Sequence, residues 1–388
     1  MITFIHTADW QLGKPFSRVA DDAKRTILRE ERFAAIRRIG ALAQASNAAF
    51  VVVAGDVFDS NRPSNETVSS ACDAIGSIGV PVYVIPGNHD HAGPGSVWEQ
   101  SFFVAESRDR APNLRVLLES SPVEEAGYVL LPCPLSRRQG GDDPTAWIRG
   151  LDWTTLSDRP RIVIAHGSTL NFRQEGDEED GGRQANLIEL DRLPMTELDY
   201  VAIGDWHGMV EGGDKAWYSG SHETDRFPKA GQTTGHVIVV QARRGGAPTT
   251  RPEPTGHTRW LVHSETFATD AGPAALKDAL NTLVGAAQRR LALLKLSLAG
   301  SLGLAGHNEL KTVLESWQAG LLDLRLDKNV AVAPTADEID ALRNTTTNTL
   351  IAKVAGDLQR QIDAGEDAEV AGTAIALLHE FVHAGGTR

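Results

Sequence analysis

The first 245 residues alternate short runs of β-branched residues with longer helical patterns, and this alternation most limits the possible folds. We expect strands at 2–5, 50–53, 82–85, 115–118, 129–131, 162–165, 200–203 and 237–241. Helices are expected at 24–45 and 66–78, where apolar residues recur at helical spacing. Strands that alternate with helices predict an α/β fold, in which layered sheets are flanked by helices.

The composition of the chain changes near residue 245. The stretch 243–254 is rich in Arg, Gly and Pro, which is typical of a linker or an irregular domain edge. Strand and helix patterns then alternate to about residue 330, with a helix expected at 274–289, and helical patterns follow to the end. We therefore predict an α/β domain over 1–245, a small α+β domain over 258–330 and C-terminal helices over 334–388.

Charge and cysteine content exclude several classes of protein. Asp and Glu number 51 against 38 Lys and Arg, a formal net charge of −13, which argues against nucleic-acid binding by bulk charge but leaves a local basic groove possible. Two cysteines are too few for a disulfide framework or a thiolate zinc site. No signal core and no apolar run of about 18 residues is present. We expect a cytoplasmic protein without a membrane partner.

Carboxylate, amide and imidazole side chains follow five of the expected strands. These residues are Asp9; Asp56 and Asp59; Asn88, His89 and Asp90; His166; and Asp205 and His207. In open α/β sheets the ligand site lies just past the carboxyl ends of the strands, so we expect these side chains to converge. A single Asp after a strand is more often a helix N-cap. Five such strand ends in one chain are hard to explain by capping.

The residue types suit two divalent metal ions. Carboxylate, amide and imidazole ligands can hold two ions that share one bridging carboxylate, an arrangement that clamps a phosphodiester during hydrolysis. We interpret Asp56 as the bridging residue. An imidazole can be neutral or protonated near pH 7, so His89 can stabilise the transition state or protonate the leaving oxygen. Asp59, three residues after Asp56, is the expected partner that orients His89.

Five segments of the chain carry a resemblance to a known family and follow one another in the order of that family. They are 6–13, 55–59 continuing into 62–64, 86–90, 166–167 and 218–221. With them the sequence resembles the calcineurin-like metallophosphoesterases and, within these, the SbcD-type DNA repair exonuclease subunits. The resemblance implies a layered metallophosphoesterase sandwich over 1–245, with the 258–330 domain as a cap. It also implies the ligands of two ions: Asp9, Gln11, Asp56 and His207 for the first, and Asp56, Asn88, His166 and Asp205 for the second.

Two positions depart from the family pattern. Gln11 and Asp205 stand where the family usually has His, so two imidazoles are replaced by oxygen donors. Oxygen ligands suit hard cations, which makes Mn²⁺ the expected ion and Mg²⁺ the alternative. The expected substrate contacts are Arg62, Ser221 and His222, although a turn role for His222 is equally compatible. Arg137, Arg138 and Arg226 are further candidates for phosphate contacts, against the alternative of a solvated surface.

The resemblance implies a DNA nuclease, an exonuclease and also an endonuclease, that works in an SbcCD-like DNA repair complex. It implies that the helices over 334–388 bind an SMC-like ATPase subunit, and that the chain forms a homodimer. Two other functions stay open. One is a phosphodiesterase or phosphatase that acts on a small nucleotide or a protein. The other is a metal-poor scaffold subunit that binds DNA ends, with Gln11 and Asp205 as signs of lost activity.

Overall fold

The computed structural model describes residues 1–169, 186–229, 231–269, 272–343, 349–365 and 367–384. The chain forms two compact units, Met1–Thr258 and Arg259–Arg388. The acidic segment 174–180, which we expect from the sequence to be a loop, lies outside the described residues. Among the described helices, none combines the length and apolar character that crossing a bilayer requires.

The first unit contains two six-stranded sheets. The first sheet runs in the order β14 (Thr249–Pro254), β13 (His236–Ala242), β1 (Ile2–Thr7), β2 (Val51–Val53), β3 (Val82–Val84) and β4 (Leu114–Val116). Strands β1 to β4 are parallel, while β13 is antiparallel to both β1 and β14. Because β1, β2 and β3 are parallel neighbours, the loops that follow them emerge at the same edge of the sheet.

The second sheet has a similar parallel centre. Its order is β11 (Val210–Gly213), β12 (Ala216–Tyr218), β10 (Tyr200–Gly204), β7 (Arg161–His166), β6 (Val129–Cys133) and β5 (Val123–Glu124). Strands β12, β10, β7 and β6 are parallel, and the two outer strands are antiparallel to their neighbours. The short strands β8 (Ser168–Thr169) and β9 (Leu187–Ile188) pair separately.

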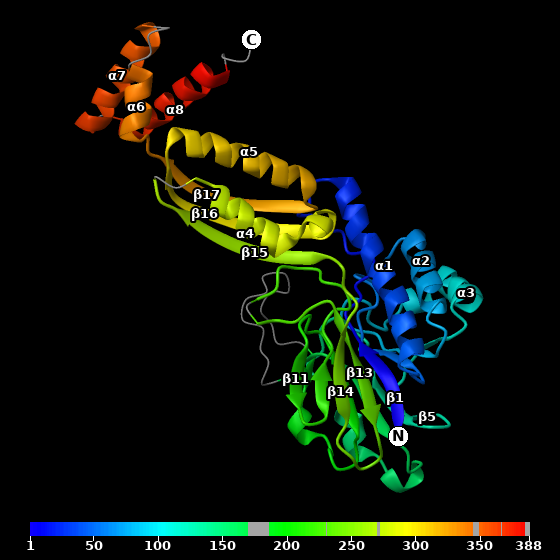
Figure 1. Ribbon diagram of the computed structural model, residues 1–388. Coiled ribbons are helices and arrows are strands. Elements are labelled where there is room, and N and C mark those ends of the chain that lie inside the picture. Colours follow the sequence, from blue (N-terminus) through cyan, green and yellow to red (C-terminus); the bar gives the residue numbers. More distant parts are fainter. Residues whose placement is uncertain (170–185, 230, 270–271, 344–348, 366, 385–388) are drawn as a thin grey trace. The chain divides into compact units, whose positions relative to one another are not determined.

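The period-2 alternation of the strands builds two apolar layers on each sheet. Phe4 of β1 packs between the sheets, stacked on Phe50 with ring centroids 4.9 Å apart and edge-on to Tyr200 of the other sheet at 5.4 Å. Its neighbour Ile5 faces the opposite layer, which contains α1 (Asp22–Ala45), α2 (Asn65–Gly76) and α3 (Ser101–Arg110). These helices lie together in Figure 1. The layered sandwich predicted from the sequence is confirmed.

Short 3-10 helices complete the first unit. Their bounds are η1 (Val97–Glu99), η2 (Ala146–Gly150), η3 (Trp153–Thr155) and η4 (Leu190–Arg192). Ile148 of η2 and the partly buried Trp153 of η3 pack in the apolar cluster on the outer face of the second sheet. Each sheet is therefore covered on its outer side, with the longer helices on the first sheet only.

The second unit begins with a small parallel sheet in the order β15 (Arg259–Phe267), β16 (Ala292–Leu302) and β17 (Asp323–Val332). The crossovers contain α4 (Ala274–Val284), η5 (Ala286–Leu291) and α5 (Leu304–Gly320). Leu280 of α4 and Leu310 of α5 pack in one cluster with Leu294 and Leu296 of β16. The unit thus combines a parallel sheet with helices in its crossovers.

Three helices end the chain: α6 (Ala336–Arg343), α7 (Thr349–Ala364) and α8 (Ala368–Ala384). Leu342, Ala355 and Ile375, one from each helix, share an apolar cluster with Leu304 of α5. The Glu338 carboxylate of α6 also accepts hydrogen bonds from the amides of Leu304, at 2.9 Å, and Ala305, at 2.8 Å. The C-terminal helices therefore pack onto the start of α5.

Two sequence expectations differ from the structure. The stretch 243–254, expected as a linker, contains β14, which pairs along its whole length with β13. The helix expected to run to residue 289 ends at Val284, because Gly285 adopts a φ of +73° that residues with a side chain rarely take.

Candidate metal centre

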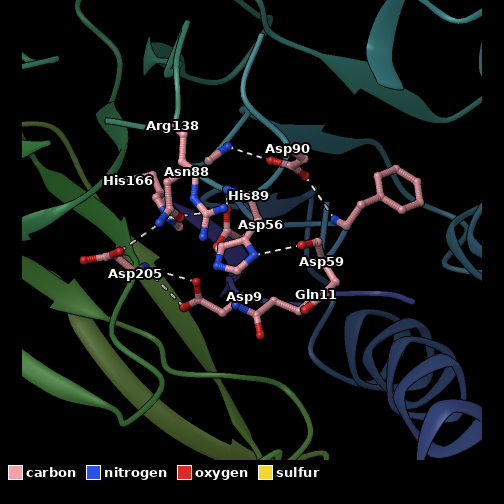
Figure 2. A network of polar contacts seen from close by, with 12 residues as sticks. Asp9, Gln11, Asp56, Asp59, Asn88, His89, Asp90, Arg138, His166 and Asp205 are labelled. Carbon is pink, nitrogen blue, oxygen red and sulfur yellow. Dashed lines mark hydrogen bonds and ion pairs between the residues drawn. The ribbon is translucent and has the colours of Figure 1, made fainter. Parts of the chain in front are cut away.

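The loops after five parallel strands converge at one end of the sandwich (Figure 2). Asp9, Asp56 and Asn88 follow β1, β2 and β3 of the first sheet. His166 is the last residue of β7, and Asp205 directly follows β10 in the second sheet. The structure thus brings together side chains from both sheets, as the positions of these residues at strand ends predict.

Hydrogen bonds hold the loops after β1 and β2 against each other. The amide of Asp9 donates to the carbonyl of Gly55 at 3.2 Å, and that of Gln11 donates to Asp56 at 2.8 Å. Asp9 and Asp56 have φ angles of +54° and +56°, in the left-handed region that costs a residue with a side chain about 1 kcal/mol or more. The paired loops hold this strained backbone and aim both carboxylates at the same place.

One buried group can hold a metal ion. The ligand atoms of Asp9, Asp56 and His166 all lie within 4.8 Å of one another. His166 Nδ1 donates to the carbonyl of Ala54 at 2.8 Å, so Nε2 faces Asp56 Oδ1 at 3.6 Å. A backbone carbonyl that orients a ligating imidazole in this way is common at metal sites. The donor set of two carboxylates and one imidazole fits a divalent cation.

Two predicted ligands border this group. Asn88 Oδ1 lies 2.9 Å from His166 Nε2, and Asp205 Oδ1 lies 3.8 Å from the same nitrogen. The other carboxylate oxygen of Asp205 accepts a hydrogen bond from Ser168 Oγ at 2.8 Å, while its amide donates to Asp9 at 3.1 Å. Asp205 therefore lies beside His166 and Asp9.

The electrostatics of the group favour a cation. Burial raises the pKa of Asp9, His166 opposes this and the Asp56 and Asp205 carboxylates add to it, so that the pKa reaches about 7. Burial lowers the pKa of His166, but the carboxylates of Asp56, Asp9 and Asp205 outweigh it and raise that pKa to about 9. Crowded carboxylates with such shifts retain protons in place of a missing positive charge, which a bound cation supplies.

Two glycines leave room for the ligands. A Cβ added to Gly55 would lie 2.2 Å from His166 Nδ1, and one added to Gly87 would lie 2.1 Å from Asp56 Oδ1. Both distances are far below any normal contact. These positions are glycine because the backbone runs directly against the side chains of the metal group.

His89 lies next to the metal group. Its amide donates to Asp56 Oδ1 at 2.9 Å, and its Nε2 is 4.0 Å from Asp56 Oδ2. Its Nδ1 lies 2.8 Å from the backbone carbonyl oxygen of Asp59. The structure thus shows the expected pairing of His89 with Asp59, but the contact is made by the Asp59 backbone rather than by its carboxylate.

Asp90 and Arg32 support the site; the sequence pattern places Asp90 among the converging side chains without a role, and it does not mark Arg32. The Asp90 carboxylate accepts from the amides of Gly87, at 2.8 Å, and Phe58, at 3.0 Å, which ties the loops after β2 and β3 together. Arg32, 1% exposed on α1, donates to the carbonyls of Asp9, Trp10 and Glu223. Asp90 ends the segment 86–90, so its position was a signal, whereas nothing in the pattern of the helix marks Arg32.

Gln11 and His207 form a second polar group. Their Nε2 atoms are 3.3 Å apart, and Lys14 Nζ lies 2.8 Å from Gln11 Oε1. His207 Nδ1 lies 3.0 Å from an oxygen of the fully buried Asp225 carboxylate. Lys14 and Asp225 are absent from our sequence-based site, because the contact between them joins positions 211 residues apart.

The expected substrate contacts lie in different surroundings. Ser221 is buried beside the first loop, where it forms a parallel bridge with Ala8. His222 is fully buried and donates from Nε2 to the carbonyl of Arg32 at 2.9 Å, while Arg62 is exposed in the loop before α2. The structure does not bring His222 or Arg62 to the metal group. Arg138 points toward this group in Figure 2.

Comparison with known proteins gives a family match over most of the first unit. Residues 2–231 match the model of the calcineurin-like phosphoesterase family (Metallophos). A stretch of 97 residues is 34% identical to the uncharacterized metallophosphoesterase YhaO of Bacillus subtilis (strain 168). That match covers 24% of this chain and 24% of the relative, so the chain spans about a quarter of the length of this curated relative.

Two solved structures are weakly similar to the chain. One crystal structure covers 65% of this chain and 98% of its own, with 13% identity and a TM-score of 0.40. The other, TT1561 of Thermus thermophilus, covers 57% of this chain and 89% of its own, with 14% identity and a TM-score of 0.36.

The family match and the geometry concern the same residues. The matched segment 2–231 is more than half of the 388 residues and contains Asp9, Asp56 and His166, the buried group that fits a divalent ion. The chain therefore belongs to the calcineurin-like phosphoesterase family.

Proposed function

We propose that this protein hydrolyses phosphodiester bonds of DNA, as the nuclease subunit of an SbcCD-like repair complex. The observation that carries the hydrolytic part is the buried group of Asp9, Asp56 and His166 with the His89 imidazole beside it. The DNA substrate and the repair complex rest on the sequence resemblance. Each is therefore tested by its own experiment.

The chain supplies both the ligands and the groups around the phosphate. Asp9, Asp56 and His166 would hold a divalent ion, with Asn88 and Asp205 adjacent. A bound ion supplies Lewis-acid stabilisation of charge on the phosphate oxygens. Mn²⁺ is the ion we propose, with Mg²⁺ as a substitute, because most of these ligands present oxygen.

His89 is the residue we propose to move a proton. Its Nδ1 faces a carbonyl, which only accepts, so Nδ1 keeps its hydrogen and proton exchange takes place at Nε2. The side chain is 21% exposed, in contrast to the buried ligands, so a substrate can reach it. An imidazole that protonates the leaving oxygen contributes about 10²–10⁴-fold to the rate.

The choice of DNA over a small ester rests on the segments that carry the resemblance. The opening segment 6–13 and the segment 218–221 meet in the structure through the bridge between Ala8 and Ser221. The described members of the metal group all belong to the first unit, so hydrolysis of a small ester gives the second unit no role. In a subunit that binds a partner, the second unit has a role in that binding.

The C-terminal helices are the surface we propose for an SMC-like ATPase. Leu350 of α7 and Val370 and Leu377 of α8 are each more than 60% exposed. Exposed apolar residues on amphipathic helices are typical of helix-in-groove recognition. The homodimer implied by the resemblance belongs to the same proposal, and sedimentation of the purified chain at several concentrations tests it.

The decisive assay compares three kinds of substrate in Mn²⁺: end-labelled DNA, both single- and double-stranded, bis-p-nitrophenyl phosphate and p-nitrophenyl phosphate. We expect cleavage of DNA and of the diester, stimulated on duplex DNA by the ATPase, with Asp56→Asn inactive on all three. Turnover of the monoester alone would replace the nuclease by a phosphatase. A wild-type chain that binds no metal would favour the alternative of a scaffold subunit that binds DNA ends.

A further inference from the structure

A lysine is bonded to one of the residues that the resemblance implies as ligands of the first ion. Nζ of Lys14 lies 2.8 Å from Gln11 Oε1 and 2.7 Å from Asp225 Oδ2. The Asp225 carboxylate is fully buried, and the Lys14 side chain is 16% exposed. An ammonium group only donates hydrogen bonds, so the atom of Gln11 that faces it is the amide oxygen. That oxygen is the atom with which an amide ligates a metal.

The imidazole of His207 is engaged in the same way. Because Gln11 Oε1 faces Lys14, the amide nitrogen faces His207, with 3.3 Å between the two Nε2 atoms. His207 Nδ1 lies 3.0 Å from Asp225 Oδ2 and donates its proton to this carboxylate, which leaves the lone pair on Nε2. This lone pair accepts from the Gln11 amide, and one guanidinium nitrogen of Arg226 lies against the ring, 3.2 Å from Nδ1 and 3.3 Å from Nε2.

The positive charges beside Gln11 and His207 bear on whether the protein holds one metal ion or two. Gln11 accepts a hydrogen bond from the Lys14 ammonium, and the Arg226 guanidinium lies against the His207 ring, so a cationic side chain contacts each of the two residues. A divalent ion on these ligands would displace their hydrogen bonds and would be repelled by both cations. By contrast, the Asp9 and Asp56 carboxylates accept hydrogen bonds from the backbone amides of Asp205 and His89.

We propose that this protein holds a single divalent ion tightly, at Asp9, Asp56 and His166, and that the Lys14 ammonium takes the place of the second. The substitution of Gln for His at position 11 fits this arrangement, because an amide offers Lys14 an acceptor and His207 a donor at once. A neutral imidazole at position 11 would offer one acceptor and one donor on a rigid ring, without the same reach.

Lys14 also has a chemical use in this position. Two of its three N–H groups are accounted for by Gln11 and Asp225. The third can donate to a phosphate oxygen, which is the charge stabilisation that a second ion gives in two-metal enzymes. This use rests on the proposed function, whereas the number of ions bound does not depend on any substrate.

The test counts metal ions on the full-length chain. Mn²⁺ is titrated by calorimetry, and the electron paramagnetic resonance spectrum is recorded at saturation. We expect one Mn²⁺ per chain and a six-line mononuclear spectrum for the wild type. Lys14→Met removes the charge and frees the Gln11 oxygen. We expect this variant to bind a second Mn²⁺ ion with an affinity at least about tenfold higher than the wild type has for a second ion, and to give an exchange-coupled multiline spectrum.

Two control variants separate this effect from misfolding. Lys14→Arg keeps the charge and should bind one ion. Lys215→Met removes a part-buried lysine that is bonded to the carbonyls of Met195 and Leu198, and it should also bind one ion. Circular dichroism establishes that each variant is folded. If Lys14→Met fails to fold, Lys14→Gln, which also removes the charge but keeps a polar side chain, replaces it, with the same expected gain.

Each outcome bears on the inference separately from the proposed function. Two coupled Mn²⁺ ions in the wild type would overturn it, even if the protein cleaves DNA. A folded Lys14→Met variant that still binds one ion would also overturn it, because Lys14 would not be what excludes the second. One ion in the wild type and two in the variant, without DNA cleavage, would support the inference and contradict the nuclease function.

Discussion

The His89 ring is oriented by the backbone of Asp59, with Nδ1 at 2.8 Å from the carbonyl oxygen. A backbone carbonyl remains in place when the side chain of its residue is changed. A substitution of the Asp59 side chain should therefore leave the His89 ring oriented, unlike at a site where a carboxylate side chain accepts from the imidazole.

The first prediction follows from this contact. Asp59→Asn should keep hydrolysis of the diester within about threefold of the wild type, because the carbonyl still accepts from His89. His89→Ala should lose about 10²–10⁴-fold in kcat while it binds Mn²⁺ as before. Steady-state kinetics and metal titration of both variants check this. A loss in Asp59→Asn as large as that in His89→Ala would show that the carboxylate acts in the reaction.

Asp56→Asn should abolish tight metal binding. The substitution keeps the shape of the side chain but removes one of the two carboxylates in the buried group, and neutral amides are weak ligands for divalent ions. Calorimetric titration with Mn²⁺ measures the loss. Asp73→Asn is the matched control, since Asp73 forms an exposed pair with Arg110 on the outer helices and should leave the affinity unchanged.

Arg32→Lys should destabilise the first unit. One ammonium cannot span the carbonyls of Asp9, Trp10 and Glu223 that the guanidinium reaches, so a buried carbonyl loses its partner at a cost of about 1–3 kcal/mol. Urea unfolding measures the change. Arg37→Lys on the same helix is the control, because Arg37 is exposed and its change should stay within about 0.5 kcal/mol. Equal stability of the two variants would contradict a structural role for Arg32.

Glu338→Gln should lower the stability of the second unit in a pH-dependent way. Burial raises the pKa of Glu338, but hydrogen bonds from the amides of Ala305, Thr335 and Leu304 outweigh it and hold the pKa below the ordinary 4.5. Such a group stabilises the fold above its unfolded-state pKa, and the effect is lost as the pH falls through the lower folded-state pKa. By analogy with helix caps we expect a difference of about 1 kcal/mol at pH 7.

Thermal unfolding at pH 7 and at pH 3 checks this prediction. The midpoints of wild type and Glu338→Gln should differ at pH 7 and approach each other at pH 3. Glu315→Gln, an exposed substitution on α5, should match the wild type at both values. A difference that is the same at both pH values would mean that the charge of Glu338 does not contribute.

The strands were predictable where burial on both faces dictates the residues. Val51, Val52 and Val53 form a β-branched run that only a central strand explains, and all three are fully buried. Strand β14 was not predictable, because Pro252 and Pro254 argue against a strand. It lies at the edge of its sheet, where a missing backbone N–H leaves no neighbour unsatisfied.

The site was predictable to the extent that its residues follow strands. Asp9, Asp56 and His166 could be placed because the end of a parallel strand defines where a side chain goes. The residues that hold these ligands in place are different. Arg32 lies on a helix that carries several other, less buried arginines, and its contact with Glu223 joins positions 191 residues apart. No periodicity carries that information, so only the folded structure shows it.

The two sheets of the sandwich contribute to one ion site, and this arrangement has a consequence for the lifetime of the protein. Asp9 and Asp56 belong to one sheet and His166 to the other, so a bound ion fastens the two halves across their seam. An ion that binds the folded chain alone adds stability in proportion to the logarithm of its free concentration, about 1.4 kcal/mol for each tenfold increase above the Kd. Metal starvation should therefore shorten the survival of this protein before it limits its turnover.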